Sequence, residues 1–380
     1  MNNKNAIIAV LVLAALLFSL FTLFVSSEWD LRTNARSAIL FCPDGNLTLY
    51  ASNENQRLPM ASTTKIMTAI VALENSKLDK TVIIDDEAVG TEGSSAYLKG
   101  GDTYTLEGLL YALLLQSAND AAVAIAINVG GTQDRFVEMM NQKAEDLNLR
   151  DTHFANPNGL DAKDHYTSAY DLARLSSYAL KNADFSRIVS TKTKTVISNE
   201  GTLRTFYNHN KLLGSFDGCI GVKTGYTKSS GRCLVSAALR DGMTLVAVTL
   251  DDGDDWRDHK EMLEYGFTNY EKTVLASKHE YSYNIPLLNS SDKTTITATN
   301  KDEISVILPK KHGRIESKLK IKDYVIAPVI KDEILGKVIF TLDGKQIAEV
   351  DLSAIDSATE KDDAGFIKRI KNYIINLFSR

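Results

Sequence analysis

Between about residues 36 and 271, hydrophobic and polar positions follow the periodicities of both strands and helices. Two short apolar runs, Ser37–Cys42 and Leu47–Ala51, flank Pro43-Asp44-Gly45-Asn46, a combination typical of a β-hairpin. Apolar residues then recur at helical spacing over three longer segments, Thr63–Glu74, Thr105–Val129 and Gln133–Leu149.

Two further apolar runs predict another pair of strands near the end of this region. Arg232–Leu239 and Met243–Asp251 lie on either side of Asp241-Gly242, a dipeptide that suits a tight turn. Strands at both ends with helices between them indicate an α+β fold, in which helices pack on an antiparallel sheet. We therefore expect one α+β domain over residues 28–271.

The pattern changes after about residue 275, where helical spacing disappears. Lys293–Thr299 and Glu303–Leu308 have the composition of strands, and Val338–Leu352 predicts two strands that turn at Asp343-Gly344. We expect a small all-β domain over residues 275–355.

The N-terminal run Ala6–Val25 is strongly apolar and holds no charge, and Lys4 is the only charged residue before it. A helix of this length would cross the hydrocarbon core of a bilayer. Ser26 and Ser27 are small residues that a signal peptidase accepts near its cleavage point. We expect residues 1–27 to be an export signal, and both cleavage and retention as a membrane segment remain open.

The C-terminal segment, Gly365–Arg380, combines one apolar helical face with four positive charges. It is too short and too basic to span a membrane, but it suits an amphipathic helix that lies in the membrane interface and binds anionic lipid. The alternative is a helix that docks on the protein's own core. The polar, acidic residues 356–364 predict a linker, which favours the membrane.

Composition narrows the classes of protein that need to be considered. With 380 residues, of which 44% are hydrophobic and 24% charged, the chain can bury substantial cores and is not of a disordered or collagen-like class. A net charge of −5 provides no basic field for nucleic acid. Three scattered cysteines predict neither a disulfide framework nor a Cys-rich zinc site.

The six histidines lie too far apart for a ligand motif, and Asp251–Asp255 lacks the spacing of a calcium loop, so we expect no metal and no organic cofactor.

The first motif that could carry chemistry is Ser62-Thr63-Thr64-Lys65. Ser62 lies at the N-terminus of a predicted helix, and the spacing puts Lys65 one turn further along the same face. A single motif of this kind is most often an N-cap serine beside a surface lysine.

A second motif, Ser117-Ala118-Asn119, is a polar break between two strongly apolar helical runs. Such a break is usually only a loop, but buried polar groups beside apolar helices need partners, and a cleft provides them.

The third motif is Lys223-Thr224-Gly225 within GVKTGYT, where the glycines suit a strand that another segment approaches closely. A phosphate-binding loop requires Gly directly before Lys, and Val222 stands there instead. The chain also has no G-x-S-x-G motif, so an α/β-hydrolase triad is unsupported. His209, in NHNKLL, is a weaker candidate for lining a cleft.

In this order, in a chain with an export signal, the three motifs resemble those of the serine penicillin-binding and β-lactamase superfamily. The sequence is similar in particular to the low-molecular-mass penicillin-binding proteins, the D-alanyl-D-alanine carboxypeptidases. The resemblance implies a β-lactamase/transpeptidase-like catalytic domain, followed by an all-β domain and a membrane anchor. The chain differs at Ala118, where many relatives have Gly or Asp. The matching segments are ARSAILF, LPMASTTKIMTA, LLLQSANDAAVAIA, HFANPNGL and GVKTGYT.

The same resemblance implies a role for each motif residue. Ser62 would attack the penultimate D-alanine carbonyl of a peptidoglycan stem peptide, and Lys65, made neutral by burial beside Lys223, would take its proton. The backbone N–H groups of Ser62 and Tyr226 would form the oxyanion hole. The other implied roles are a proton relay for Ser117, hydrogen bonds to substrate and to Lys65 for Asn119, and binding of the terminal carboxylate by Lys223, Thr224 and the adjacent Gly225.

A member of this family would work at the outer face of the cytoplasmic membrane, in cell-wall synthesis, and would be acylated at Ser62 by penicillin and other β-lactams. Two alternatives stay open. A β-lactamase would need a deacylating glutamate in E-x-x-x-N spacing, and Glu145 lies one residue too close to Asn148. A non-catalytic wall-associated scaffold would keep the fold without the chemistry.

Overall fold

The computed structural model describes residues 31–361, which fall into two units, each with its own hydrophobic core. The expected export signal at residues 1–27 and the expected amphipathic helix at residues 365–380 both lie outside the described residues. Within residues 31–361, no helix has both the length and the apolar character needed to cross a membrane.

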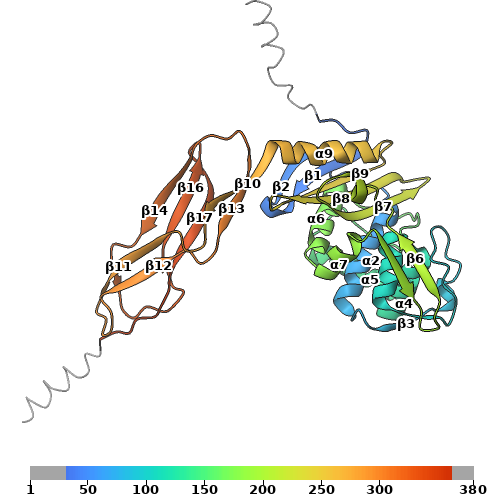
Figure 1. The fold of residues 1–380 in the computed structure, drawn as a ribbon, viewed down its shortest axis with the longest axis horizontal. Helices are drawn as coiled ribbons and strands as arrows, with labels where there is room; N and C mark the ends of the chain where they lie inside the picture. Colours follow the sequence, from blue (N-terminus) through green and yellow to red (C-terminus); the bar gives the residue numbers. More distant parts are fainter. Residues whose placement is uncertain (1–30, 362–380) are drawn as a thin grey trace, which may run out of the picture. The chain divides into compact units, whose positions relative to one another are not determined.

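A five-stranded sheet with the order β2-β1-β9-β8-β7 lies at the centre of the first unit, which becomes the catalytic unit of the sections below (Figure 1). β1 pairs antiparallel with β9, and β7 pairs antiparallel with β8. Asp241 and Gly242, both with positive φ, join β8 to β9 in the tight turn that the sequence predicts. The strands are β1 (Ser37–Cys42), β2 (Leu47–Ser52), β7 (Cys219–Thr227), β8 (Gly231–Arg240) and β9 (Met243–Leu250).

Eight helices accompany this sheet in the part of the chain that the structure describes. In Figure 1, α9 lies along one face of the sheet and the other labelled helices lie beyond the opposite face. Their bounds are α2 (Lys65–Asn75), α3 (Leu106–Leu115), α4 (Asn119–Gly130), α5 (Gln133–Asp146), α6 (Ala169–Leu180), α7 (Ala183–Val189), α8 (Leu212–Ser215) and α9 (Asp255–Asn269).

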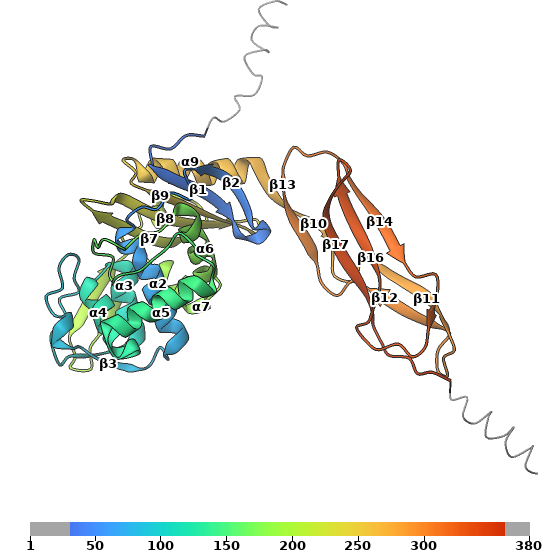
Figure 2. The same ribbon diagram turned by 180° about the vertical axis from the view of Figure 1, so that it is seen from behind.

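Helix α2 is the centre of the helical layer, as the view from behind in Figure 2 also shows. It packs against α3, α4, α5, α6 and α7, and its first eight residues are all buried. The sequence KIMTAIVAL is apolar nearly all round, which is typical of a helix enclosed by others. The helical segment Thr105–Val129 consists of two helices, α3 and α4, which are separated at the polar break that the sequence indicates, where Ser117 adopts a left-handed φ of 62°.

Two pairs of short strands extend from the helical layer. β3 (Thr81–Ile83) pairs with β4 (Thr103–Thr105), and β5 (Thr193–Ile197) pairs with β6 (Leu203–Tyr207). Both pairs are antiparallel, and neither was predicted from the sequence.

The second unit contains strands and no helix from Tyr270 to residue 361, so the predicted succession of an α+β domain and an all-β domain is confirmed. Its larger sheet has the order β14-β16-β17-β12-β11-β15, and β10 pairs separately with β13. The strands are β10 (Tyr270–Ala276), β11 (Ser282–Leu288), β12 (Thr295–Thr299), β13 (Ile304–Pro309), β14 (Ile315–Ile321), β15 (Val325–Ile326), β16 (Ile334–Leu342) and β17 (Lys345–Ala354).

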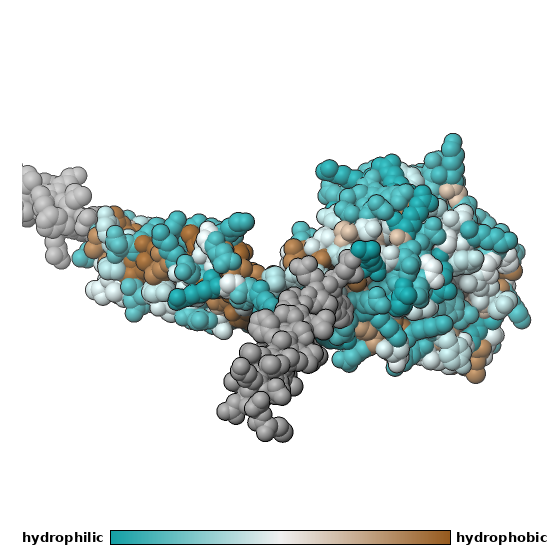
Figure 3. Space-filling model, turned by 90° about the horizontal axis from the view of Figure 1, so that it is seen from above, coloured by the Kyte–Doolittle hydropathy of each residue, from teal (hydrophilic) through white to brown (hydrophobic). Residues whose placement is uncertain are grey.

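Part of the apolar content of this second unit lies on its surface. Ile326, Ile330 and Ile334 are more than half exposed, and apolar patches are visible on this unit in Figure 3. Individually exposed apolar side chains are normal on soluble domains. The larger apolar set, which includes Val338, is buried in the unit's own core.

Candidate active site

Ser62 lies in a short 3₁₀ turn, Ala61–Thr64 (η2), that leads directly into α2. Ala61 has a φ of 46°, in the left-handed region that residues with a Cβ seldom occupy. Gly159 and Gly225 approach this turn so closely that a Cβ at Gly159 would overlap the Ala61 carbonyl, and one at Gly225 would lie 3.0 Å from the Ser62 nitrogen. Two segments distant in sequence therefore hold the backbone on either side of Ser62.

Lys65, the first residue of α2, is completely buried next to Ser62. Its Nζ lies 2.9 Å from Ser62 Oγ and 2.7 Å from Asn119 Oδ1. Burial is the main cause that lowers the pKa of Lys65 well below its ordinary value, and the positive charge of Lys223 lowers it further. A lysine in this setting is able to act as a base toward the Ser62 hydroxyl.

The Lys65 amine also donates a hydrogen bond to the backbone carbonyl of Asn158, a partner that sequence reasoning missed. Asn158 belongs to HFANPNGL, where the Gly159 N–H donates to Asn156 Oδ1 and the Leu160 N–H donates to Asn158 Oδ1. These bonds shape a turn that presents the carbonyl to Lys65. The Asn158 carbonyl could not be recognised from the sequence as a partner of Lys65, because every residue has a backbone carbonyl. The only signal in the sequence was the motif HFANPNGL itself.

Ser117 and Asn119 lie at the break between α3 and α4, and each is 5% exposed. Asn119 is the first residue of α4, and its side chain joins two segments: Oδ1 accepts from Lys65, and Nδ2 donates to the Glu92 carbonyl. Its backbone N–H donates to the Ser94 carbonyl at 2.7 Å. Ser117 lines the cleft beside Ser62.

Lys223, Thr224, Gly225 and Tyr226 lie in β7. Lys223 is buried, its Nζ donates to the Thr224 carbonyl at 2.9 Å, and burial lowers its pKa to about 7. The three residues that follow it line the cleft, with the Tyr226 side chain two-thirds exposed. These three residues of β7 thus form one wall of the cleft, and Lys223, next to them in the strand, is buried.

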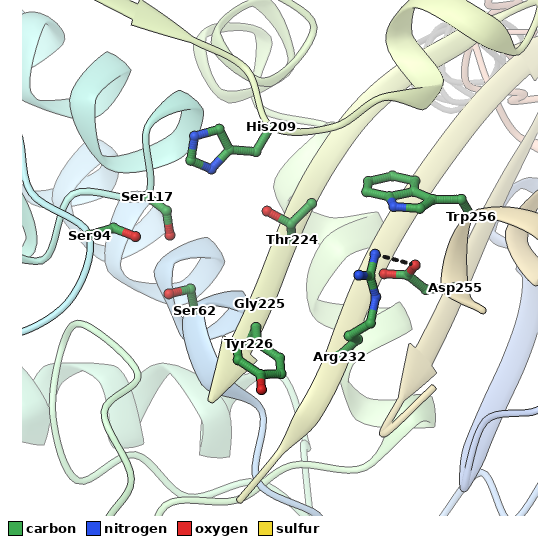
Figure 4. A pocket seen from close by; sticks show the side chains of 10 residues that line it. All are labelled: Ser62, Ser94, Ser117, His209, Thr224, Gly225, Tyr226, Arg232, Asp255 and Trp256. Atoms are coloured by element: carbon green, nitrogen blue, oxygen red, sulfur yellow. Dashed lines mark hydrogen bonds and ion pairs between the residues drawn. The ribbon is translucent and has the colours of Figure 1, made fainter. Parts of the chain in front are cut away.

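The cleft has a volume of about 530 Å³ (Figure 4). His209, the weaker sequence candidate, is part of the lining. Sequence reasoning missed Arg232, whose Nη2 lies 2.7 Å from the buried Asp255 Oδ1. The complete lining is Ser62, Ser94, Ser117, His209, Thr224, Gly225, Tyr226, Arg232, Asp255 and Trp256.

Residues of the acidic run Asp251–Asp255 take part in ion pairs. Asp255 pairs with Arg232, and Asp254 pairs with Arg257 at 3.0 Å. Among the residues from 31 to 361, no group of three or more histidine, cysteine or acidic residues is placed to hold a metal ion.

Comparison with known proteins identifies the family of the chain. Residues 25–254 match the family model described as D-alanyl-D-alanine carboxypeptidase, and residues 270–360 match the C-terminal domain of penicillin-binding protein 5. The chain is 31% identical to the D-alanyl-D-alanine carboxypeptidase DacF of Bacillus subtilis over 352 residues, which is 90% of each chain. It is 29% identical to DacC of Escherichia coli, over 91% of this chain and 88% of that protein.

Solved structures give the same result. The chain superimposes on penicillin-binding protein 5 of Haemophilus influenzae with a TM-score of 0.72 and 26% identity, over 87% of this chain and 98% of that one. The protein is therefore a serine peptidase, with an α+β catalytic domain followed by an all-β domain. It belongs to the D-alanyl-D-alanine carboxypeptidase family, as its motifs indicated.

Proposed function

We propose that the protein is a serine-type D-alanyl-D-alanine carboxypeptidase that removes the terminal D-alanine from peptidoglycan pentapeptide stems. The observation that carries this proposal is the 2.9 Å distance between Lys65 Nζ and Ser62 Oγ, at the edge of an open cleft. Family membership supports the same activity.

Acylation begins when neutral Lys65 takes the Ser62 proton as Oγ attacks the carbonyl carbon of the penultimate D-alanine. A new ester bond forms, the peptide C–N bond breaks, and the departing D-alanine amine receives the proton from Lys65 through the Ser117 hydroxyl. Water then hydrolyses the ester and regenerates the Ser62 hydroxyl. Asn119 holds the Lys65 amine in place, in line with its 2.7 Å bond to Lys65. Asn119 also donates a hydrogen bond to the substrate backbone.

Two backbone N–H groups, those of Ser62 and Tyr226, stabilise the negative oxygen of the tetrahedral intermediate. The close approach of Gly225 to the Ser62 nitrogen supports this pairing, since it brings the β7 backbone beside the nucleophile. Loss of one oxyanion donor typically lowers kcat about 10²- to 10³-fold, so the position of each donor matters for the rate.

The free carboxylate of the substrate needs hydrogen bonds and a positive counter-charge. Thr224 lines the cleft and provides a hydroxyl, but Lys223 is buried with its amine directed to the Thr224 carbonyl. Arg232 is 45% exposed at the cleft, and its ion pair with Asp255 fixes the guanidinium there. Arg232 therefore joins Thr224 as a carboxylate-binding residue, and Lys223 acts mainly through its charge on Lys65.

β-Lactams are ligands of the same site, because their strained amide carbonyl reaches Ser62 as the substrate carbonyl does. The resulting ester is hydrolysed slowly, so penicillin labels the enzyme. The rival β-lactamase function lacks support, since Glu145 is exposed on α5 and does not line the cleft. A non-catalytic scaffold would not need a buried lysine hydrogen-bonded to a serine, whereas Lys65 and Ser62 have this arrangement.

Release of D-alanine from a synthetic pentapeptide tests the proposal. The wild-type protein releases D-alanine, and Ser62→Ala does not. Equal release by both proteins would rule out the serine mechanism, and no release by either would favour the scaffold. Rapid turnover of a chromogenic cephalosporin would favour the β-lactamase.

The substrate class places the enzyme outside the cytoplasmic membrane, in line with the apolar run Ala6–Val25. The basic segment Gly365–Arg380 adds attachment to the membrane surface. Deletion of residues 365–380 is expected to release active enzyme from membranes. If the shortened protein still sediments with membranes, the N-terminal run is the anchor.

A further inference from the structure

A chain of hydrogen bonds behind the active site connects His165 to the turn that carries Ser62. The backbone N–H of Ala155 donates to His165 Nδ1 at 3.0 Å, and His165 Nε2 lies 2.7 Å from Thr64 Oγ1. The Thr64 hydroxyl donates to the Ala61 carbonyl at 2.7 Å. Both His165 and Thr64 are buried.

The partners determine the direction of this hydrogen-bond chain. Nδ1 accepts a backbone N–H, so it carries no proton, and the proton of the neutral ring is on Nε2. Nε2–H therefore donates to Thr64 Oγ1, whose single proton is directed to the Ala61 oxygen. Reversal of the chain would leave the Ala155 N–H facing an N–H group.

The surroundings keep His165 in this neutral form. Burial is the main cause that lowers its pKa to about 4. The ring of Phe154 packs edge-on against the imidazole, with 6.0 Å between the ring centroids. The donor at Nε2 is thus both neutral and fixed in position before substrate arrives.

The Ala61 carbonyl, where the hydrogen-bond chain ends, belongs to the same peptide group as the Ser62 N–H. A trans peptide is planar, and its C=O and N–H point in opposite directions, so a bond that fixes the carbonyl also fixes the direction of the N–H. Ala61 has the left-handed φ of 46°, a conformation that persists only where the surroundings hold it.

We propose that His165 and Thr64 are positioning residues that direct the Ser62 backbone N–H toward the oxyanion formed during acylation and deacylation. The inference rests on the proposed function, because it assigns the Ser62 N–H to the oxyanion hole. Neither side chain lines the cleft, so both act through the Ala61–Ser62 peptide and not on the substrate.

The catalytic unit contains a matched pair that serves as a control. Thr249 Oγ1 lies 3.0 Å from His259 Nε2, and both residues are completely buried. Thr249 is in β9 and His259 in α9, and neither lines the cleft. This pair has the same residue types and burial as Thr64 and His165, but its further hydrogen bonds go to Ser236 and Asp252 and not to the Ser62 turn.

The first experiment compares Thr64→Val with Thr64→Ser and Thr249→Val. Valine has the shape of threonine but no hydroxyl, so Thr64→Val is expected to lower kcat about 10-fold or more, with KM within about 3-fold, because the oxyanion donor is misdirected. Thr64→Ser keeps the hydroxyl and should remain within about 3-fold of wild-type kcat. Thr249→Val should lower the melting temperature but leave kcat unchanged. Equal kcat values for Thr64→Val and Thr249→Val would overturn the proposal.

A second pair of variants decides the question if Thr64→Val does not fold. His165→Gln keeps an amide N–H near the position of Nε2, whereas His165→Met has similar volume without a donor. The glutamine variant should retain most of the wild-type kcat, and the methionine variant should lose about as much as Thr64→Val. In the double variant His165→Met/Thr64→Val, the losses should not multiply, since both break one chain. Equal kcat for the two His165 variants, or fully multiplicative losses, would contradict the proposal.

Acylation of Ser62 by a fluorescent penicillin separates this inference from the proposed function. The rate constant of acylation depends on the oxyanion hole even if the pentapeptide proves not to be the substrate. Absence of D-alanine release by wild type would overturn the function, whereas unchanged acylation rates for Thr64→Val and His165→Met would overturn the positioning role alone.

Discussion

Lys65 and Lys223 are both buried, and the positive charge of Lys223 lowers the pKa of Lys65. Burial is the main cause of the lowered pKa of each lysine. Although one lysine begins a helix and the other lies in a strand, they form one electrostatic unit next to Ser62. This relationship leads to two predictions, one on rate and one on stability.

The acylation rate of Ser62 should rise with pH through the lowered pKa of Lys65, because only the neutral amine can take the serine proton. Lys223→Met removes a positive charge, so the pKa of Lys65 should increase and the rising part of the pH profile should shift to higher pH. Acylation by a fluorescent penicillin, measured between about pH 5 and about pH 9, tests this. An unshifted profile would mean that Lys223 does not act on Lys65 through its charge.

Lys223→Met should also stabilise the fold at moderately acid pH while it impairs the enzyme. The folded-state pKa of about 7 lies below the ordinary value of 10.5, so between these pH values the unfolded chain binds more protons than the folded protein. Stability therefore rises with pH over this window, and the full cost of the buried amine is present below about pH 7. Thermal unfolding should show a larger gain for the variant at about pH 6 than at about pH 10. A gain of equal size at both pH values would contradict this assignment.

Gly225→Ala should lower the acylation rate strongly, because the new Cβ would lie 3.0 Å from the Ser62 nitrogen and 3.2 Å from the Met60 carbonyl. Both neighbours are backbone atoms, so the turn that carries Ser62 must move. We expect a loss of about 10²-fold, comparable to removal of an oxyanion donor. Gly214→Ala is the control, since a Cβ there meets no atom within 4 Å. Similar rates for both variants would show that the β7 backbone does not constrain Ser62.

Arg232→Gln should raise KM for a pentapeptide with a free C-terminal carboxylate, because it removes the counter-charge in the cleft. Loss of one charge-assisted hydrogen bond to the substrate should lower kcat/KM by about 10- to 10²-fold. The same variant should have little effect on a substrate whose C-terminus is an amide or ester. A loss of equal size for both substrates would show that Arg232 supports the fold of the cleft and does not bind the carboxylate.

The spacing of residues was sufficient to predict the geometry of the first motif. Because Ser62 and Lys65 are three positions apart at a helix start, one turn brings Nζ to Oγ, and the structure has this arrangement. The turn at Asp241-Gly242 was equally predictable, since both residues tolerate positive φ.

Arg232 could not be assigned to the cleft from the sequence, because its place depends on strand register. It pairs with Tyr226 between β8 and β7, and a shift of one residue would turn its side chain to the other face of the sheet. His165 is a similar case: its contact with Thr64 depends on how HFANPNGL and the residues after it fold back to α2. Contacts between segments that are distant in the sequence leave no pattern in the residues around either partner, so they could not be predicted.

The missed strands of the second unit have a different explanation. β14 contains Lys318 and Lys320 on exposed positions, and β11 contains Pro286, so neither has the continuous apolar pattern that marks a buried strand. Each strand is held by its neighbours, β14 by β16 and β11 by β12.

The contacts of Lys65 have a consequence for the chain before it has folded. The acceptors Ser62, Asn119 and Asn158 come from three separate segments, and Lys223 from a fourth. In an unfolded chain, Lys65 is an ordinary solvated lysine, protonated at neutral pH, and Ser62 is an ordinary serine. The nucleophile therefore comes into being only when the catalytic unit is assembled. Covalent labelling by penicillin consequently counts correctly folded molecules, which makes it a direct assay of maturation for this protein.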